Sequence, residues 1–191
     1  MKIYILLILS FISLNSFGKS MPKVKFHTGK GFFVIKVDTV RAPMTGNHFL
    51  HLVKTGIYQN GLIYRVVNDW NQTDNPVRID VVQGGLYHDD LVNNVRSIPH
   101  EPTIKTGIRH RNGVISMARN EPGTASSEFF ICIGNQPELD YEGNRNPDGQ
   151  GFAAFGKVIR GMKIIRKIHS LPDSGQYLIQ PIVFTCELQE Q

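Results

Sequence analysis

The apolar residues of this chain fall mostly into short runs rich in Val, Ile and Phe, a pattern typical of β-strands. The first two runs, residues 24–28 and 32–37, flank Gly29-Lys30-Gly31 and predict a β-hairpin. Further runs predict strands at residues 62–67, 80–83, 113–118, 128–133, 152–159 and 182–188.

Two segments carry the period of an amphipathic helix instead. The first begins at Pro43, which suits a first helical position, and Gly56 is placed as its stop; its apolar residues are Phe49, Leu50, Val53 and Ile57. The second must end before Pro172, and its apolar residues are Met162, Ile165 and Ile168. Two helices among about eight strands favour a closed barrel capped at its ends, because closure removes exposed strand edges.

The first 18 residues differ from the rest of the chain. Lys2 precedes an apolar run over residues 3–12, which is shorter than the roughly 20 residues that a bilayer span needs. Ser16 and Gly18 then supply small residues for a signal peptidase. We therefore predict a signal peptide over residues 1–18, a single domain over residues 19–191, and a periplasmic or secreted protein without stable membrane insertion. An uncleaved N-terminal anchor is the alternative.

Composition and charge describe a globular protein with a mild basic bias. The chain has 191 residues, enough for one domain, of which 41% are apolar and 19% charged. Its formal net charge of +5 becomes +4 without residues 1–18, which contain Lys2 and no acidic residue. The nearest approach to a nucleic-acid-binding patch is residues 105–111, Lys-Thr-Gly-Ile-Arg-His-Arg. We interpret this stretch as a solvated loop and predict no nucleic-acid partner.

The two cysteines, Cys132 and Cys186, both lie in apolar alternating runs, so we favour two free buried thiols. Export would permit a disulfide between them, and the sequence alone leaves that alternative open. The seven His residues are scattered, and Asp89-Asp90 lacks the spacing of a calcium loop. We predict no metal site and no cofactor.

Neither a nucleophile motif nor a phosphate or dinucleotide loop occurs in the chain. Two polar residues instead stand inside apolar strands: Arg65, within residues 62–67, and Gln83, at the end of Val81-Val82-Gln83. Both need partners if they are buried. From these fragments alone, a surface position for Arg65 and a turn at Gln83 remain open alternatives.

Taken in order, five blocks of the sequence closely resemble the cyclophilins: Ile63-Tyr64-Arg65-Val66, Val82-Gln83-Gly84-Gly85, Gly113-Val114-Ile115-Ser116-Met117-Ala118-Arg119, Ser127-Glu128-Phe129-Phe130-Ile131 and Phe155-Gly156-Lys157-Val158. The similarity runs from about residue 24 to residue 188. It implies a mainly β fold, a closed eight-stranded antiparallel β-barrel capped by two α-helices, with an outer groove for Xaa-Pro segments.

The resemblance implies peptidyl-prolyl cis-trans isomerase activity on unfolded or folding proline-containing polypeptides. Arg65 is then the catalytic donor to the proline nitrogen, and Gln83 binds the substrate backbone and braces Arg65. The other substrate-binding residues that it implies line the proline seat and the groove: Val81, Met117, Ala118, Arg119, Phe130, Leu139 and Phe152. Phe129, the neighbour of Phe130, should point into the core, because successive strand residues face opposite ways.

Several positions depart from the family pattern. Tyr64 stands where the family usually has His, and Asp80 stands where a groove aromatic is usual. An Asn/Asp-rich insertion, residues 68–78, replaces a short turn and carries the only tryptophan, Trp70. We hypothesise that Trp70 folds back to replace the missing wall of the proline pocket; a solvent loop with Trp70 packed elsewhere is the alternative.

Three further departures reshape the groove. Glu128 stands where Gln is common, Glu138 where Trp or Phe often lies beside the pocket, and Phe152 where His or Tyr is usual. Because the missing aromatic is associated in the family with binding cyclosporin, we predict weak inhibition by that peptide.

Three functions compete at this point. The first is an exported isomerase, which we expect to be a monomer. The second is a catalytically weak peptide-binding module or holdase that uses the same groove and has lost turnover through Asp80 and Glu138. The third, a small-ligand barrel of the lipocalin type, lacks the long up-and-down strand pattern and explains none of the five blocks.

Overall fold

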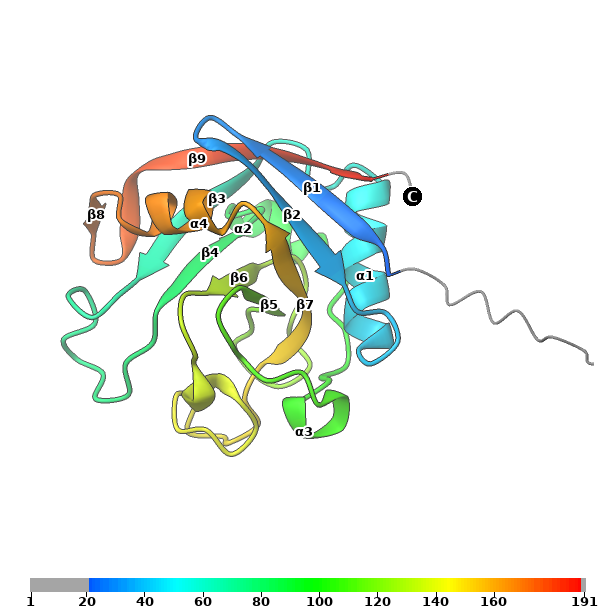
Figure 1. The fold of residues 1–191 in the computed structure, drawn as a ribbon. Helices are drawn as coiled ribbons and strands as arrows, with labels where there is room; N and C mark the ends of the chain where they lie inside the picture. The colour runs from blue at the N-terminus through cyan, green and yellow to red at the C-terminus, as the bar shows by residue number, and fades with distance from the viewer. Residues whose placement is uncertain (1–20, 190–191) are drawn as a thin grey trace, which may run out of the picture.

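A computed structural model describes residues 21–189 of the chain (Figure 1). The predicted signal peptide, residues 1–18, lies outside the described residues. The strands are β1 (Lys23–Thr28), β2 (Gly31–Val37), β3 (Gly61–Val67), β4 (Val81–Gly85), β5 (Val114–Met117), β6 (Phe129–Cys132), β7 (Ala153–Arg160), β8 (Asp173–Ser174) and β9 (Tyr177–Leu188). The helices are α1 (Pro43–Lys54), α2 (Asp89–Asn93), α3 (Thr103–Thr106), α4 (Met162–His169) and the 3-10 helix η1 (Pro137–Leu139).

Eight of these strands form a closed antiparallel barrel, as predicted. Their order is β1-β2-β7-β5-β6-β4-β3-β9, and pairing of β1 with β9 closes the ring. Helices α1 and α4 lie on opposite sides of the barrel in Figure 1. The short strand β8 only extends β9 into a hairpin, and the apolar pattern of the sequence predicted neither β8 nor α2, α3 and η1. Elements of two to five residues are too short to display a hydrophobic period.

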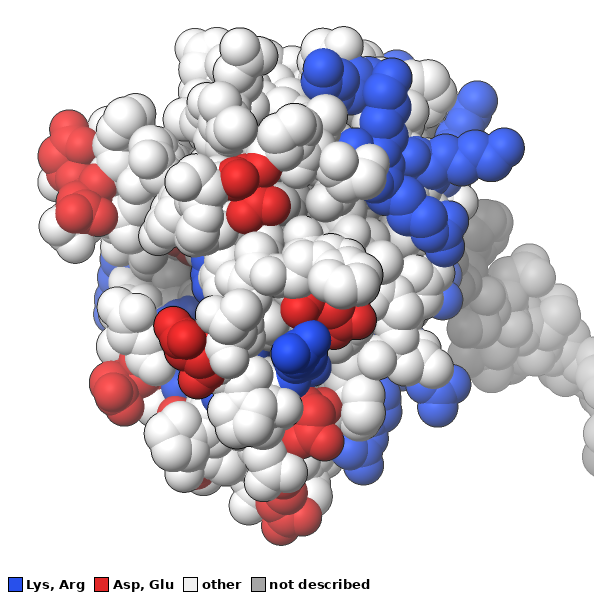
Figure 2. Space-filling model, turned by 90° about the vertical axis from the view of Figure 1, so that its left-hand side faces the viewer, with Lys and Arg blue, Asp and Glu red and all other residues white. Residues whose placement is uncertain are grey.

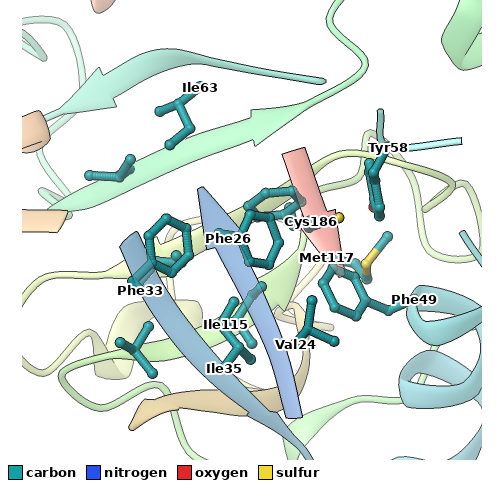
Figure 3. Packing of buried hydrophobic residues seen from close by; sticks show 14 of the residues in the cluster. Val24, Phe26, Phe33, Ile35, Phe49, Tyr58, Ile63, Ile115, Met117 and Cys186 are labelled. Carbon is teal, nitrogen blue, oxygen red and sulfur yellow. The ribbon is translucent and has the colours of Figure 1, made fainter. Parts of the chain in front are cut away.

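The barrel is filled by aromatic rings packed against one another (Figure 3). Phe26 of β1 lies 4.7 Å from Phe33 of β2 and 5.8 Å from Phe129 of β6, measured between ring centroids. Helix α1 adds Phe49, whose ring centroid is 4.9 Å from that of Phe155. Phe129 therefore points into the core, as predicted from strand alternation.

A second, smaller apolar cluster lies apart from this core. Its members come from β3, β4, β6, η1 and the residues just before β4 and β7: Val67, Ile79, Val81, Phe130, Cys132, Leu139 and Phe152. Phe130 belongs to it because neighbouring strand residues point to opposite faces. Both cysteines are buried and free, as favoured from the sequence. This smaller cluster thus forms an apolar surface outside the core of the barrel.

The described part of the chain contains no helix with the length and apolar character needed to cross a bilayer. On the face shown in Figure 2, Lys and Arg side chains gather most densely at the upper edge, whereas Asp and Glu are scattered. Basic charge is therefore distributed unevenly over this face.

Candidate active site

An open groove of about 360 Å³ lies above the smaller apolar cluster. It contains eight of the ten residues predicted for the site: Arg65, Val81, Gln83, Ala118, Arg119, Phe130, Leu139 and Phe152. These residues are spread over almost ninety positions of the sequence, and barrel closure brings them together. Met117 and Trp70 are absent from the lining.

The floor of the groove is apolar. Phe130 and Phe152 meet edge to face, with ring centroids 5.2 Å apart, and Leu139 of η1 and Val81 of β4 complete the surface. All four side chains belong to residues that are less than a tenth exposed. The floor therefore offers a rigid seat for a small apolar ring.

Arg65 projects from β3 at a bulge, where the register shifts against both β4 and β9. Its Nη1 donates to Oε1 of Gln83 at 2.8 Å, and its Nε donates to Oε1 of Gln176 at 3.0 Å. Nη2 of Arg65 donates to the same Gln176 oxygen. Within residues 21–189 no carboxylate forms an ion pair with this guanidinium, so both of its braces are neutral.

Burial lowers the pKa of Arg65, and the nearby Tyr177 and Tyr64 act in the opposite direction. A guanidinium starts from a pKa above about 12, so the side chain keeps its charge at physiological pH. The groove thus holds a permanent cation that is partly withdrawn from water and not neutralised by a carboxylate.

Gln176 is a site residue that the sequence analysis missed. It lies in the turn between β8 and β9 with a left-handed backbone (φ +77°), and its N–H donates to Oδ1 of Asp173 at 3.0 Å. Its Nε2 donates to the backbone oxygen of Asn71 at 2.9 Å, which leaves Oε1 for Arg65. Gln176 and Arg65 are 111 positions apart, and no local pattern marks the pair.

Gln83 is held in place by Tyr64 and Glu128, two residues that depart from the family pattern. Its Nε2 is bonded to the Tyr64 hydroxyl at 2.7 Å, and that hydroxyl donates to Oε2 of Glu128. Oε1 of Glu128 accepts from the backbone N–H of Leu86 at 2.7 Å. Burial and the neighbouring Glu128 raise the pKa of Tyr64 far above its ordinary value, so the hydroxyl stays protonated. Gln83 is therefore fixed with its oxygen toward Arg65.

Two more arginines line the groove. The guanidinium of Arg119 forms two bonds with Asp148, at 2.7 and 2.9 Å, and lies 5.2 Å from the ring centroid of Phe152. Arg145, which the sequence analysis missed, donates from Nη1 to Oε1 of Gln72 at 3.0 Å. Gln72 is a buried residue of the 68–78 insertion, so the insertion reaches the groove through this contact.

The prediction for Met117 is wrong. Its side chain is fully buried in the main core, beside Phe49 in Figure 3. Strand alternation in β5 explains the error, because Met117 points inward and the next residue, Ala118, lines the groove.

The structure also contradicts the hypothesis for Trp70, which is 88% exposed and lines a separate hollow with Asp80 and His169. Asp80 does not face the proline seat either: its carboxylate lies 3.5 Å from Nε2 of His169. Ile79 supplies the wall, because it points to the same side as Val81. Glu138 accepts hydrogen bonds from Asn144 and is absent from the groove lining.

Among the described residues, no group of three or more His, Cys, Asp or Glu side chains has the arrangement of a metal site. The groove places the guanidinium of Arg65, held by two amides, beside an apolar seat, and its described lining contains no Ser, Cys or His nucleophile paired with a base. Such a site can polarise and orient a bound group without forming a covalent bond to it.

Comparisons with known proteins show to which family the chain belongs. Residues 23–187 match the family described as cyclophilin type peptidyl-prolyl cis-trans isomerase/CLD. The peptidyl-prolyl cis-trans isomerase B of Escherichia coli is 30% identical over 146 residues, which cover 76% of this chain and 82% of that protein. The isomerase cyp18 of Streptomyces antibioticus is 29% identical over 169 residues, covering 85% and 95%.

A crystal structure of a cyclophilin type isomerase of Cryptosporidium parvum shares the fold, with a TM-score of 0.70 at 20% identity. It covers 90% of this chain and 99% of the other. With the family match over most of its length, the chain belongs to the cyclophilin type peptidyl-prolyl cis-trans isomerases.

Proposed function

We propose that this cyclophilin type isomerase accelerates Xaa-Pro isomerisation in folding polypeptides, with Arg65 as the donor to the proline nitrogen. The observation that carries the proposal is the position of an uncompensated guanidinium beside an apolar seat. The seat binds the proline ring, and the cation acts on the bond that must rotate.

The chemistry requires little else. Rotation about Xaa-Pro is slow because resonance gives the C–N bond double-bond character, with a barrier of roughly 20 kcal/mol. Twisting the bond localises a lone pair on the proline nitrogen, so a donor aimed there stabilises the twisted state more than either planar state. Gln83 and Gln176 occupy three of the five N–H groups of Arg65, and the remaining ones are available to the substrate.

The neutral braces support this role. A carboxylate partner would attract the guanidinium charge away from the developing lone pair, whereas amide oxygens orient the same group and leave its net charge intact. Both side-chain polar atoms of Gln83 are already bonded, to Arg65 and Tyr64. In this proposal Gln83 is mainly a positioning residue, and a bond from it to the substrate backbone must compete with these contacts.

The same proposal places the enzyme outside the cytoplasm. The apolar run and the small residues over residues 1–18 support export, with periplasmic or secreted proteins as substrates. Cell fractionation followed by N-terminal sequencing of the purified protein tests this part. We expect a mature protein that begins at Lys19; recovery of an intact N-terminus in the cytoplasmic fraction would contradict it.

The experiment for the activity is a protease-coupled assay on Xaa-Pro tetrapeptides with wild type, Arg65→Ala and Arg65→Lys. Loss of a transition-state donor should lower kcat by about 10²–10³ in Arg65→Ala. The kcat of Arg65→Lys should lie between those of the wild type and Arg65→Ala, because an ammonium cannot reproduce the planar guanidinium that two glutamines hold. Equal rates for wild type and Arg65→Ala would favour the peptide-binding module instead.

A further inference from the structure

A second hollow, of about 370 Å³, lies on the barrel where β2, β7 and the segment before β5 meet. It shares no lining residue with the isomerase groove. Half of its lining residues are cations, contributed by three separate parts of the chain: Lys36, Arg41, Arg109, Arg111 and Lys157. We refer to it as the basic hollow.

Little negative charge balances these cations. Asp38 is the only carboxylate in the lining, and both of its oxygens are bonded to Arg41. Arg109 has a carboxylate oxygen of Asp140 at 3.6 Å. Within residues 21–189, no ion pair is formed by Lys36, Arg111 or Lys157.

The strand register places like charges next to one another. Lys36 of β2 stands directly opposite Lys157 of β7 and, on its other side, opposite Lys23 of β1. Like charges at opposite positions of antiparallel strands are destabilising. The core does not require these lysines, because all three are exposed, and in β2 the neighbours of Lys36, Ile35 and Val37, are buried instead. A bound anion would offset the repulsion.

The loop before β5 is fixed with two arginines toward the basic hollow. Ile108 and His110 are buried, and His110 is bonded to Asp140 through its backbone N–H and its Nδ1, at 2.9 and 2.8 Å. Arg109 and Arg111 alternate with these anchors and stay exposed. The basic stretch 105–111 is therefore more than the solvated loop expected from the sequence, since part of it forms a wall of the hollow.

We propose that the basic hollow binds a compact phosphate-bearing anion of the oligophosphate class. Guanidinium forks and ammonium groups converging on a concavity suit the several charged oxygens of linked phosphates. The limited size of the hollow, about 370 Å³, favours a compact ligand over an extended polyanion, which needs a longer basic surface. The proposed ligand is a free oligophosphate, and the phosphate headgroups of lipids carry the same kind of charged oxygens.

The test is calorimetric titration of the purified protein with tripolyphosphate at constant ionic strength, with citrate as a multivalent anion that lacks phosphate. The informative variant is Lys36→Gln/Lys157→Gln. The matched control is Lys163→Gln/Lys167→Gln, which removes the same charge from exposed positions of α4 outside the hollow. We expect saturable binding of tripolyphosphate that weakens about tenfold or more in the first variant and at most about twofold in the control.

Thermal unfolding supplies an independent measurement. Tripolyphosphate should raise the Tm of the wild type and of the control, because a ligand that binds only the folded state stabilises it. Lys36→Gln/Lys157→Gln should show no such rise, while its Tm without ligand stays equal or increases through loss of like-charge repulsion. Unchanged isomerase turnover in both double variants shows that they fold.

The proposal is overturned if no saturable binding occurs, if both double variants lose affinity equally, or if citrate binds as tightly as tripolyphosphate. The first result would show that the hollow binds no oligophosphate. The second would show that affinity depends only on the net charge of the protein, and the third that binding is not selective for phosphate. Sedimentation with vesicles that contain phosphatidylglycerol separates the two sources: binding to vesicles without binding to tripolyphosphate would overturn the soluble ligand.

Discussion

Gln176→Met is the substitution that most directly tests how Arg65 is positioned. Methionine has similar length and no amide, so the change removes the oxygen that accepts from Nε and Nη2 of Arg65 while keeping the side-chain volume. A net hydrogen bond to a charged group is worth about 1.5–3 kcal/mol. If even one such bond is needed to hold the guanidinium in its productive position, kcat should fall about 10- to 100-fold, with KM changed much less.

The control is Gln176→Glu, which keeps an acceptor oxygen for Arg65. Both variants lose the bond from Nε2 to the backbone oxygen of Asn71, so the cost of losing that bond is common to them. In the protease-coupled assay we expect Gln176→Glu to retain more activity than Gln176→Met and less than the wild type, because its oxygen still orients Arg65 while its negative charge partly neutralises the guanidinium. Thermal unfolding of both variants should shift the Tm by similar amounts.

A double-mutant cycle with Arg65→Ala shows whether Gln176 acts through Arg65. In the Arg65→Ala background, Gln176→Met should cause no further loss of kcat. A loss as large as in the wild type would refute the reasoning, as would a fully active Gln176→Met single variant. An active Arg65→Ala variant is a separate result, because it would overturn the donor role itself.

Three other predictions concern Trp70, His110 and the groove. Trp70→Ala should leave kcat/KM unchanged within about twofold and stability within about 0.5 kcal/mol, because the side chain is exposed and outside the groove; a larger loss of kcat/KM would restore it to the site. Burial lowers the pKa of His110, although its bond to Asp140 acts in the opposite direction. The folded state then binds fewer protons than the unfolded one, so stability should be complete above pH about 6.5 and decrease as the pH falls through that value. Urea unfolding between pH 8 and 5.5, with NMR titration of the ring, checks this, and a ring that titrates above 6.5 would contradict it. Cyclosporin should inhibit the protein only weakly in the peptide assay, because Glu138 stands where the family often has Trp or Phe, and Arg145 lines the groove instead of such an aromatic side chain. Nanomolar inhibition would contradict this prediction.

The barrel could be predicted from the sequence because its long strands carry strong apolar runs. The same runs identified Arg65 and Gln83, since a polar residue inside an apolar strand is a visible exception. Met117 was misplaced because all four residues of β5 are buried and only the residue after the strand, Ala118, lines the groove.

Gln176 and Arg145 could not be found in this way. Each lies in a polar turn or loop, and each makes its decisive contact with a residue more than 70 positions distant in the chain. For Trp70 the error was to predict a site residue that is not one. A large aromatic side chain in a polar insertion suggested a binding role, but Trp70 is exposed and Ile79 forms that wall of the groove.

The 68–78 insertion has a function in this structure that its single tryptophan does not reveal. Asn71 accepts from Gln176 through its backbone oxygen, and its Nδ2 donates to Oδ1 of Asp173 at 3.0 Å, which fixes the turn that presents Gln176 to Arg65. Gln72 of the same insertion accepts from Arg145. Asn71 thus holds the glutamine that braces Arg65, and Gln72 bonds Arg145 directly. Neither contact adds a carboxylate, and within residues 21–189 neither arginine forms an ion pair with one. The insertion is therefore better understood as a neutral brace for the groove than as a replacement for its missing aromatic wall.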